Sequence, residues 1–272
     1  MIVRNEETNL EFCLESIKWC SEIVVVDMES TDRTTSIAAK YTDKIFSYPL
    51  TPAFDIARKY ASERTTKKWI LMIDADEMVT DSLRATIRNA IENDMGDVIY
   101  LPRENYIMGE WTKHTGWWPD YQMKLFKKGM VEFTGQLHSF YQVHPKARQL
   151  FLKPNRANAL VHFNYRDSTH FIEKLNSYTS VEANHLVASG KKFSKFGMLK
   201  GTLGAFYTRF LRSGGYKDGF RGLALSVFMA FYRFLTYVKI WEAQEKNAKG
   251  GWQGYDDIKK RILVGFREST TH

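Results

Sequence analysis

One short apolar run that ends in acids constrains this chain more than any other stretch. Residues 69–73 read Trp-Ile-Leu-Met-Ile, and Asp74, Asp76 and Glu77 follow at once. Such a run is typical of a parallel strand buried on both faces, with the acids at its end. In open α/β sheets ligands bind at that edge, and carboxylates two residues apart suit Mg²⁺ or Mn²⁺ carrying a diphosphate. The alternative is an acidic turn before a helix, stabilised by the helix dipole.

The same arrangement occurs earlier in the chain. Residues 22–27 read Glu-Ile-Val-Val-Val-Asp, which predicts a β-branched strand ending in Asp27. The polar loop at 28–34 supplies N-cap residues for a helix around 37–41. Because both strands would end at one edge, Asp27 and Asp74 would face one crevice. A carboxylate there can accept a hydrogen bond from a uracil N3–H or a ribose hydroxyl.

Strands and helices alternate through the first hundred residues, which favours a doubly wound, mostly parallel sheet. The expected strands are 1–3, 22–27, 44–47, 69–74 and 97–101, and the expected helices centre on 10–17, 37–41, 54–61 and 83–91. After residue 102 the pattern changes. Residues 121–126 and 131–133 predict an antiparallel hairpin, and the chain beyond Ser168 is expected to be helical.

Phosphate-binding glycine motifs do not follow these strands. The sequence contains no Gly-x-Gly-x-x-Gly and no P-loop. A diphosphate would therefore depend on the metal and on cations such as Arg4 or Arg58.

Several motifs resemble the family 2 glycosyltransferases of the GT-A fold. They are 3–7, 24–27 with Ser30 and Asp32, and 69–77. Later motifs resemble the subgroup that builds lipopolysaccharide core and related bacterial surface glycans, at 118–126, 135–138, 161–163 and 214–219. The resemblance covers nearly the whole chain. It implies an α/β fold, a GT-A type doubly wound, mostly parallel sheet with a C-terminal helical region.

By position, the resemblance also implies roles for individual residues. Asp27 would contact the nucleotide base with Arg58 near it, and Asp74 would hold the ribose. Asp76 would bind the metal. The residues expected to bind the nucleotide-sugar are Arg4, Glu6, Asp27, Arg58 and Asp74.

An inverting transfer also needs a general base within hydrogen-bond reach of the acceptor hydroxyl. Members of the subgroup often have His-Glu where this chain has His138-Ser139, and a serine cannot replace a carboxylate as a base. His138 and Asp120 are therefore the first two candidates for the catalytic base, and Glu132 is the third. The alternative for His138 is a hydrogen-bonded sheet residue. His162 is a candidate metal ligand, and its alternative is a buried, hydrogen-bonded histidine.

The tryptophans at 111–118 and the lysines at 124–128 each have two interpretations. Trp111, Trp117 and Trp118 would form a sugar-stacking wall or pack beneath a long loop. The lysines would meet acceptor phosphates or be solvated charges of the hairpin; they are Lys124, Lys127 and Lys128.

The net charge of +8 is concentrated in one segment. Between Lys191 and Ile240 stand ten Lys or Arg residues and one acid, Asp218, so ten minus one gives +9 there. Twelve Phe or Tyr residues interleave with these cations. The composition favours helices in the interface of a membrane. An oligomer interface is the second interpretation and nucleic acid the third, although no nucleic-acid motif is present.

The remaining sequence features concern the compartment. Cys13 and Cys20 lie seven residues apart on one expected helix, too far to pair, which favours a reducing compartment. The start of the chain becomes polar at residues 4–7, so no secretory signal is expected. The sequence contains no run of about 20 uncharged apolar residues, so no membrane-spanning helix is expected.

The sequence therefore predicts a metal-dependent, inverting glycosyltransferase in residues 1–165, with Mg²⁺ or Mn²⁺ as cofactor. Its expected donor is a nucleotide-sugar, first a UDP-sugar, and its acceptor a bacterial surface glycan or lipid-linked saccharide. Residues 166–272 would dock the chain on the cytoplasmic face of the inner membrane, and a homo-oligomer is possible. The alternatives are a nucleotidyltransferase using the same crevice and a scaffold that binds membrane or glycan without turnover.

Overall fold

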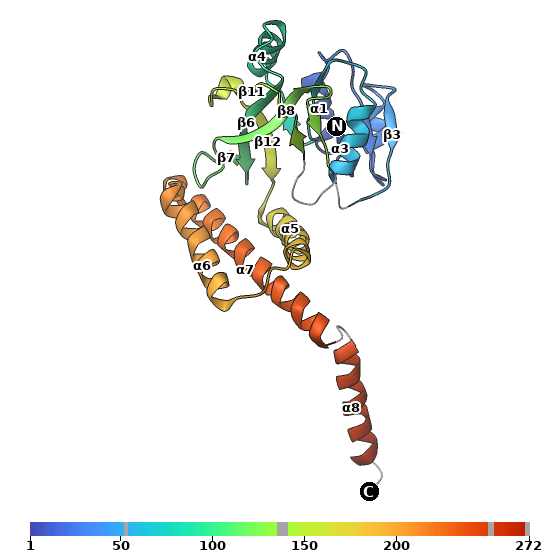
Figure 1. Cartoon of the computed structure of the whole chain (residues 1–272), viewed down its shortest axis with the longest axis vertical. Coiled ribbons are helices and arrows are strands. Elements are labelled where there is room, and N and C mark those ends of the chain that lie inside the picture. The colour runs from blue at the N-terminus through green and yellow to red at the C-terminus, as the bar shows by residue number, and fades with distance from the viewer. Residues whose placement is uncertain (52–53, 135–140, 250–252, 270–272) are drawn as a thin grey trace. The chain divides into compact units, whose positions relative to one another are not determined.

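The computed structural model divides the chain into two units, Met1–Asp167 and Ser168–His272. The boundary lies two residues beyond the expected end of the first domain. Figure 1 shows the strands in the first unit and helices alone in the second. The structure describes residues 1–51, 54–134, 141–249 and 253–269.

A small parallel sheet opens the first unit. Its strand order is β1-β2-β3, with β1 at Ile2–Val3, β2 at Val25–Asp27 and β3 at Ile45–Ser47. Side chains alternate between its faces: Val3 and Val25 enter one core, while Ile2 and Val26 enter another. The first core includes α1 (Leu10–Ile17), α2 (Thr34–Ala38) and α4 (Asp81–Glu92), and the second includes α3 (Phe54–Glu63). Helices therefore cover both faces of this sheet, as predicted.

The second sheet is mixed, which differs from the predicted parallel pairing. Its order is β4-β8-β6-β12-β5, and β7 and β11 also pair with β6. Strand β8 is antiparallel to β4 and to β6, whereas β11 and β12 are parallel to β6. The strands are β4 (Trp69–Leu71), β5 (Glu77–Met78), β6 (Val98–Ile107), β7 (Glu110–Trp111), β8 (Asp120–Lys127), β11 (Gln149–Phe151) and β12 (Leu160–Tyr165). The 3₁₀ turn η1 (Arg156–Asn158) precedes β12.

The strand expected to end at Asp74 ends earlier, at Leu71, and a turn follows it. After β4, the Asp74 N–H donates to Glu77 Oε2 at 3.0 Å, and the Glu77 N–H donates to the Asp74 carbonyl at 3.1 Å. The acids themselves close this turn. Strand β5 begins directly at Glu77 and pairs with β12.

The predicted hairpin of residues 121–126 and 131–133 is wrong. Strand β8 lies between β4 and β6, and β9 (Val131–Glu132) pairs instead with β10 (Gln142–Val143). The reason is burial: Met123, Leu125 and Phe126 are all buried, which suits a strand inside a sheet rather than one arm of an exposed hairpin.

The second unit is helical. Its helices are α5 (Ser168–Ala188), α6 (Lys195–Phe206), α7 (Gly219–Lys249) and α8 (Gln253–Ser269), and α7 packs against both α5 and α6. A π-helical turn, η2 (Tyr207–Arg212), and a 3₁₀ turn, η3 (Gly215–Asp218), connect α6 to α7. The connection is tight: a Cβ on Gly222 would overlap the Gly215 carbonyl oxygen. Glycine is therefore required at that position.

The side chain of Glu22, just before β2, contacts residues that precede β3 and β4. Glu22 Oε1 lies 2.5 Å from Lys44 Nζ, and the Thr66 N–H donates to Glu22 Oε2 at 2.8 Å. Burial alone would raise the pKa of Glu22, but Lys44 and the Thr66 donors outweigh it and lower the pKa to about 2.

Glu22→Gln should therefore change the acid stability of the protein. Because the folded pKa lies below the ordinary value of 4.5, the contribution of Glu22 is complete above pH 4.5 and is lost as the pH falls towards 2. The variant should unfold more easily at neutral pH and lose less further stability over that acid range. Urea unfolding as a function of pH measures both effects, with Glu92→Gln on the exposed end of α4 as control. An acid dependence identical to that of the wild type would contradict the assignment.

Candidate active site

A buried lysine lies between two acids of the central turn. Lys124 on β8 places its Nζ 2.7 Å from Asp74 Oδ2 and 2.6 Å from Glu77 Oε2. Arg58 on α3 donates to Asp74 Oδ1 at 3.3 Å and to Asp55 Oδ1 at 3.2 Å. Both oxygens of Asp74 therefore face a cation, one supplied by β8 and one by α3.

These cations set the charge state of Asp74. Burial alone would raise the pKa of its carboxyl, but the charges of Lys124 and Arg58 outweigh burial and hold the pKa far below its usual range. The same acids raise the pKa of Lys124 against the opposing effect of its burial. The group stays an ion-paired carboxylate at neutral pH, fixed in orientation at the edge of the sheet.

Asp76 and His162 form the second part of the site. His162 on β12 places Nε2 3.4 Å from Asp76 Oδ2. Its other ring nitrogen, Nδ1, lies 2.6 Å from Asn105 Oδ1. Asn105 Nδ2 donates to Asp120 Oδ2 at 3.1 Å and to the Trp117 carbonyl at 3.0 Å, so its Oδ1 is the atom that accepts from the histidine.

This chain of hydrogen bonds places a proton on Nδ1 of His162 and leaves Nε2 directed towards Asp76. With the proton on Nδ1, the Nε2 lone pair points towards the carboxylate of Asp76. Two acceptors that face each other at 3.4 Å are favourable only with a positive charge between them or on the ring. A histidine oriented by an amide and a neighbouring carboxylate are a usual donor set for a divalent cation. The residues present therefore fit the predicted metal, although no cluster of three such donors occurs among the residues that the structure describes.

The carboxylate of Asp120, one of the base candidates, accepts several hydrogen bonds. Arg103 donates to its Oδ2 from Nε at 2.9 Å and from Nη2 at 2.6 Å, and Gln122 donates to Oδ1 at 2.8 Å. Burial opposes these contacts, but Arg103 and the amide donors lower the pKa of Asp120. A carboxylate held in this way is a weak base. Its contact with Asn105 gives it a positioning role towards His162. The other candidate, His138, lies outside the described residues, and Glu132 is exposed on β9.

Asp27 offers a buried acceptor at the end of β2. Its Oδ2 accepts from the Ser30 N–H at 3.1 Å, while its Oδ1 is buried and has no hydrogen-bond partner among the described residues. The residue is 7% exposed. Leaving such an oxygen without a donor costs about 1–3 kcal/mol. The open oxygen therefore indicates a place for a ligand N–H or O–H.

Arg4 and Glu6 belong to a loop that is bound by the loop after β2 and by the start of α2. The Asn5 N–H donates to Ser30 Oγ at 2.9 Å, and the Glu6 N–H donates to Thr34 Oγ1 at 2.8 Å. The Glu6 side chain accepts from Asn9 Nδ2 at 2.9 Å, at the start of α1. Arg4 is exposed at the end of β1. The expected nucleotide residues thus fall into two networks, one around Asp27 and one around Asp74 and Asp76.

The three lysines expected to be solvated or to bind phosphate are all engaged within the protein. Lys124 is buried as described, and Lys127 Nζ lies 2.5 Å from Asp94 Oδ1 and 2.6 Å from Asp97 Oδ1. Lys128 Nζ donates to the Thr65 carbonyl at 2.5 Å. Both interpretations were therefore wrong for Lys124. Sequence reasoning missed it because burial of a lysine depends on partners distant in the chain.

The tryptophans contact each other and neighbouring cations. Trp111 and Trp118 meet edge to face with ring centroids 5.6 Å apart. Lys113 and Arg156 lie over the Trp111 ring, at 4.9 and 5.0 Å from its centroid. These contacts favour the packing interpretation.

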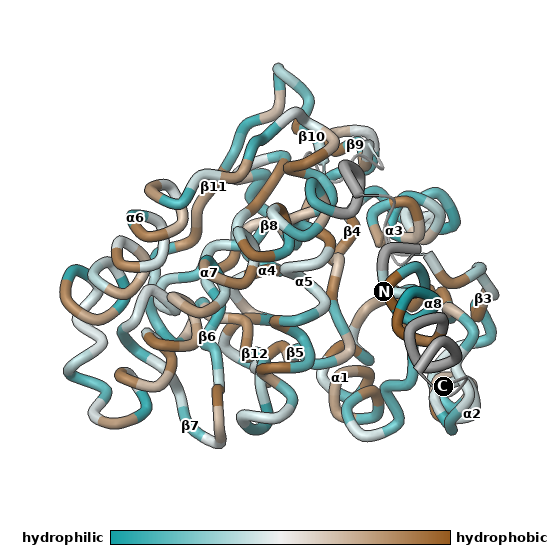
Figure 2. The backbone as a smooth tube through the Cα atoms, turned by 90° about the horizontal axis from the view of Figure 1, so that it is seen from below, coloured by the Kyte–Doolittle hydropathy of each residue, from teal (hydrophilic) through white to brown (hydrophobic). Residues whose placement is uncertain are grey.

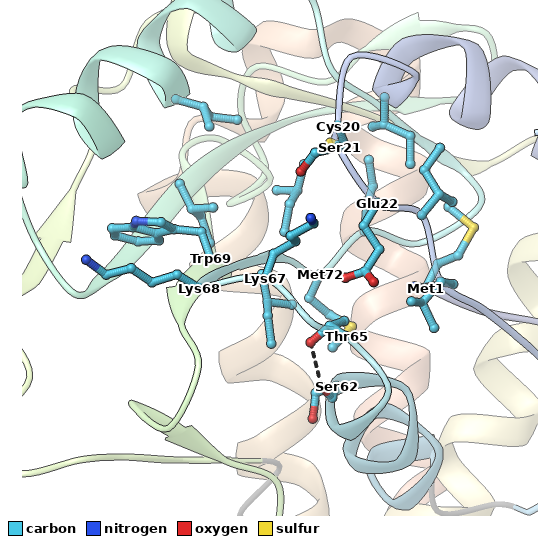
Figure 3. Close-up of a pocket in the computed structure, with 18 of the residues that line it drawn as sticks. Met1, Cys20, Ser21, Glu22, Ser62, Thr65, Lys67, Lys68, Trp69 and Met72 are labelled. Atoms are coloured by element: carbon cyan, nitrogen blue, oxygen red, sulfur yellow. Dashed lines mark hydrogen bonds between the residues drawn. The ribbon is translucent and has the colours of Figure 1, made fainter. Parts of the chain in front are cut away.

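A separate cavity of about 390 Å³ lies at the opposite end of the strands. Its walls come from residues 22–24 before β2, residues 67–73 around β4, and the start of the chain at Met1 (Figure 3). Ligands of open α/β sheets bind at the carboxyl ends of the strands, whereas this cavity lies at their amino ends. It is lined by the edge strand β4 and by Met1, which precedes β1, and none of the predicted site residues lines it.

Comparison with known proteins decides the family. The model for "Glycosyl transferase family 2" matches residues 1–148, more than half of the chain. The chain belongs to glycosyltransferase family 2. It is therefore a glycosyl-transfer enzyme, and its fold is of the GT-A type that the sequence motifs predicted.

Curated relatives extend the similarity over most of the family 2 chain. The lipopolysaccharide core biosynthesis glycosyltransferase LpsC of Rhizobium meliloti (strain 1021) is 28% identical over 262 residues, which is 92% of this chain and 93% of that protein. An uncharacterized glycosyltransferase of Rickettsia typhi is 27% identical and covers 91% of this chain and 87% of its own length. Among solved structures, S. aureus TarS in complex with UDP-GlcNAc is 13% identical with a TM-score of 0.46, covering 92% of this chain and 90% of that one.

Lys124→Met should destabilise this glycosyltransferase by about 3–5 kcal/mol, because it leaves Asp74 and Glu77 without their shared cation in a buried place. Adding Glu77→Gln should recover part of the loss by removing one of the two charges. Urea unfolding measures both variants, and Lys153→Met at an exposed position serves as control. A loss of less than about 1 kcal/mol in Lys124→Met would place this ion pair among the weak surface pairs.

Proposed function

We propose that this family 2 enzyme transfers a sugar from a nucleoside diphosphate sugar to a bacterial surface glycan, with a divalent cation and with inversion at the sugar carbon. The observation that supports the proposal most is the arrangement of Asp76 and His162, whose acceptor atoms face each other at 3.4 Å beside the ion-paired Asp74. A divalent cation bound between them would supply a positive charge to this pair.

Two carboxylates would hold the nucleoside. The open Oδ1 of Asp27 accepts an N–H from the base, and a uracil N3–H has the required donor. Asp74 keeps lone pairs free beyond its contacts with Lys124 and Arg58, and these accept from a ribose hydroxyl. Arg58 would then add a second positive charge near the diphosphate. A UDP-sugar is the donor that fits best.

Asp76 and His162 would hold Mg²⁺ or Mn²⁺. When bound there, the ion neutralises charge that develops on the departing diphosphate. Asn105 keeps the His162 lone pair directed outward by accepting from Nδ1, and Asp120 holds Asn105 in turn. These residues orient the donor set and take no proton themselves.

Inversion requires the acceptor hydroxyl to lose a proton as it attacks. The engaged Asp120 is poorly suited to receive that proton. We therefore assign the base to the segment around His138, which stays a sequence-based prediction. In this mechanism the acceptor oxygen forms a bond to the sugar carbon while the bond to the diphosphate breaks, and the proton passes to the base.

The acceptor class follows from the relative named for lipopolysaccharide core biosynthesis and from the subgroup motifs. A glycan attached to a lipid is made beside a membrane. The basic second unit would place the enzyme on the cytoplasmic face of the inner membrane, where such an acceptor is presented.

Asp76→Asn should lower donor turnover by about 100-fold or more, since it removes a charged metal ligand and with it the stabilisation of the leaving group. The measurement is Mn²⁺-dependent release of nucleoside diphosphate from a panel of nucleotide-sugars. Asp81→Asn, an exposed acid in the first turn of α4, is the matched control and should retain wild-type turnover.

Two results would contradict the proposal. Release of pyrophosphate in place of nucleoside diphosphate would identify a nucleotidyltransferase. Equal turnover by Asp76→Asn and Asp81→Asn, with and without chelator, would remove the metal from the mechanism.

A further inference from the structure

An exposed apolar stripe runs along α6 and the turn after it. Its members recur every three or four residues, which places them on one face of the helix. Each is more than half exposed; they are Phe196, Leu199, Leu203, Tyr207 and Leu211. We call these five side chains the α6 stripe, and the packing of α6 on α7 does not cover them. Figure 2 shows apolar residues recurring along α6 and α7.

Helix α7 has a second exposed stripe. The α7 stripe begins with Phe220, which is 84% exposed, and follows the same spacing. Its further members are Leu223, Val227, Phe231, Phe234 and Trp241. The opposite face of α7 is buried at Leu225 and Ile240 and packs within the unit. The helix is therefore apolar on both faces, and the second face needs a partner.

Exposed cations accompany both stripes. They lie on α6 and on the turns that join it to α7: Lys195, Lys200, Arg212 and Lys217. Asp218 is the one acid between residues 191 and 240, so this part of the chain keeps a large positive charge. A second copy of the chain would bring two such segments together, and their like charges would repel. Anionic headgroups are the partner with complementary charge.

The two cations in the second half of α7 bind side chains and a backbone carbonyl of α5. Arg233 Nη1 lies 3.0 Å from Glu182 Oε1 on α5. Lys239 Nζ donates to the Asn176 carbonyl at 2.6 Å and to Thr179 Oγ1 at 2.8 Å. These contacts fasten α7 to α5.

The same contacts argue against a membrane span. By length and composition, residues 215–245 form the one stretch of the described chain that could cross a bilayer. A span would carry Arg233 and Lys239 into hydrocarbon, where each ionised group is costly. A helix pair lying in the interface keeps these groups near water and still buries the stripes.

We propose that the hairpin of α6 and α7 lies flat in the interface of an anionic bilayer, with the α6 and α7 stripes in the acyl region and Lys195, Lys200, Arg212 and Lys217 at lipid phosphates. This deepens the proposed membrane location by naming the surface and the lipid charge. The binding is that of an amphipathic helix pair, in which apolar burial and headgroup attraction act together.

Vesicle cosedimentation of the full chain tests the proposal. The vesicles contain phosphatidylcholine alone or mixed with phosphatidylglycerol, at low and high salt. The wild type should bind the mixed vesicles and release them at high salt, because salt screens the headgroup attraction. Leu199→Ser/Leu203→Ser and Lys195→Glu/Lys200→Glu should each lower the partition constant by about tenfold or more. The controls are Ile172→Ser, an exposed apolar position on α5, and Lys153→Glu in the first unit.

All these positions are exposed, so circular dichroism should show that the variants fold. Both double variants should release nucleoside diphosphate in vesicle-free buffer at the wild-type rate, so a failure of the transferase proposal leaves the binding result intact. Equal binding to neutral and anionic vesicles, or double variants that bind like their controls, would overturn the proposal. A wild-type dimer in solution that Leu199→Ser/Leu203→Ser dissociates would assign the stripes to a second copy instead.

Discussion

The structure of the candidate site depends on one buried ion pair, that of Lys124 with Asp74 and Glu77. Strand β8 carries the lysine between β4 and β6, and the turn after β4 brings both acids to its ammonium group. An uncompensated charge in this place would be far more costly than a surface charge. The pair therefore ties the mixed sheet to the turn that presents Asp76, and it links the strand order of the protein to its chemistry.

Around this pair, each element of the site has a distinct electrostatic role. Asp74 is neutralised by two cations, whereas Asp27 keeps an open oxygen and Asp76 faces the lone pair of His162. Carboxylates that look equivalent in the sequence thus differ in what they can bind. Asp74 is already paired with cations, Asp27 has a buried oxygen without a donor among the described residues, and Asp76 lies beside an imidazole nitrogen.

Much of the first sheet was predictable from sequence, because its strands and helices are local and carry clear periodicity. The motif around Asp74 and Asp76 was recognisable for the same reason. The pairing of β8 was not predictable: Lys124 and Asp74 are fifty residues apart, and nothing local distinguishes a buried lysine from a solvated one. Asn105 and Arg103 were missed because their importance comes only from contacts with His162 and Asp120. In the second unit, the composition predicted binding to a membrane surface. Which side chains form the exposed stripes could not be predicted, because that depends on how α7 packs.

The most direct test of the account is the position of a metal ion. Crystals of the protein grown with a nucleoside diphosphate and Mn²⁺ would show the ion by anomalous scattering. The account predicts one peak within coordination distance of Asp76 and of His162 Nε2, with the nucleobase donating to Asp27 Oδ1. An ordered nucleotide whose Mn²⁺ lies away from both ligands, or whose base leaves Asp27 unpaired, would contradict it.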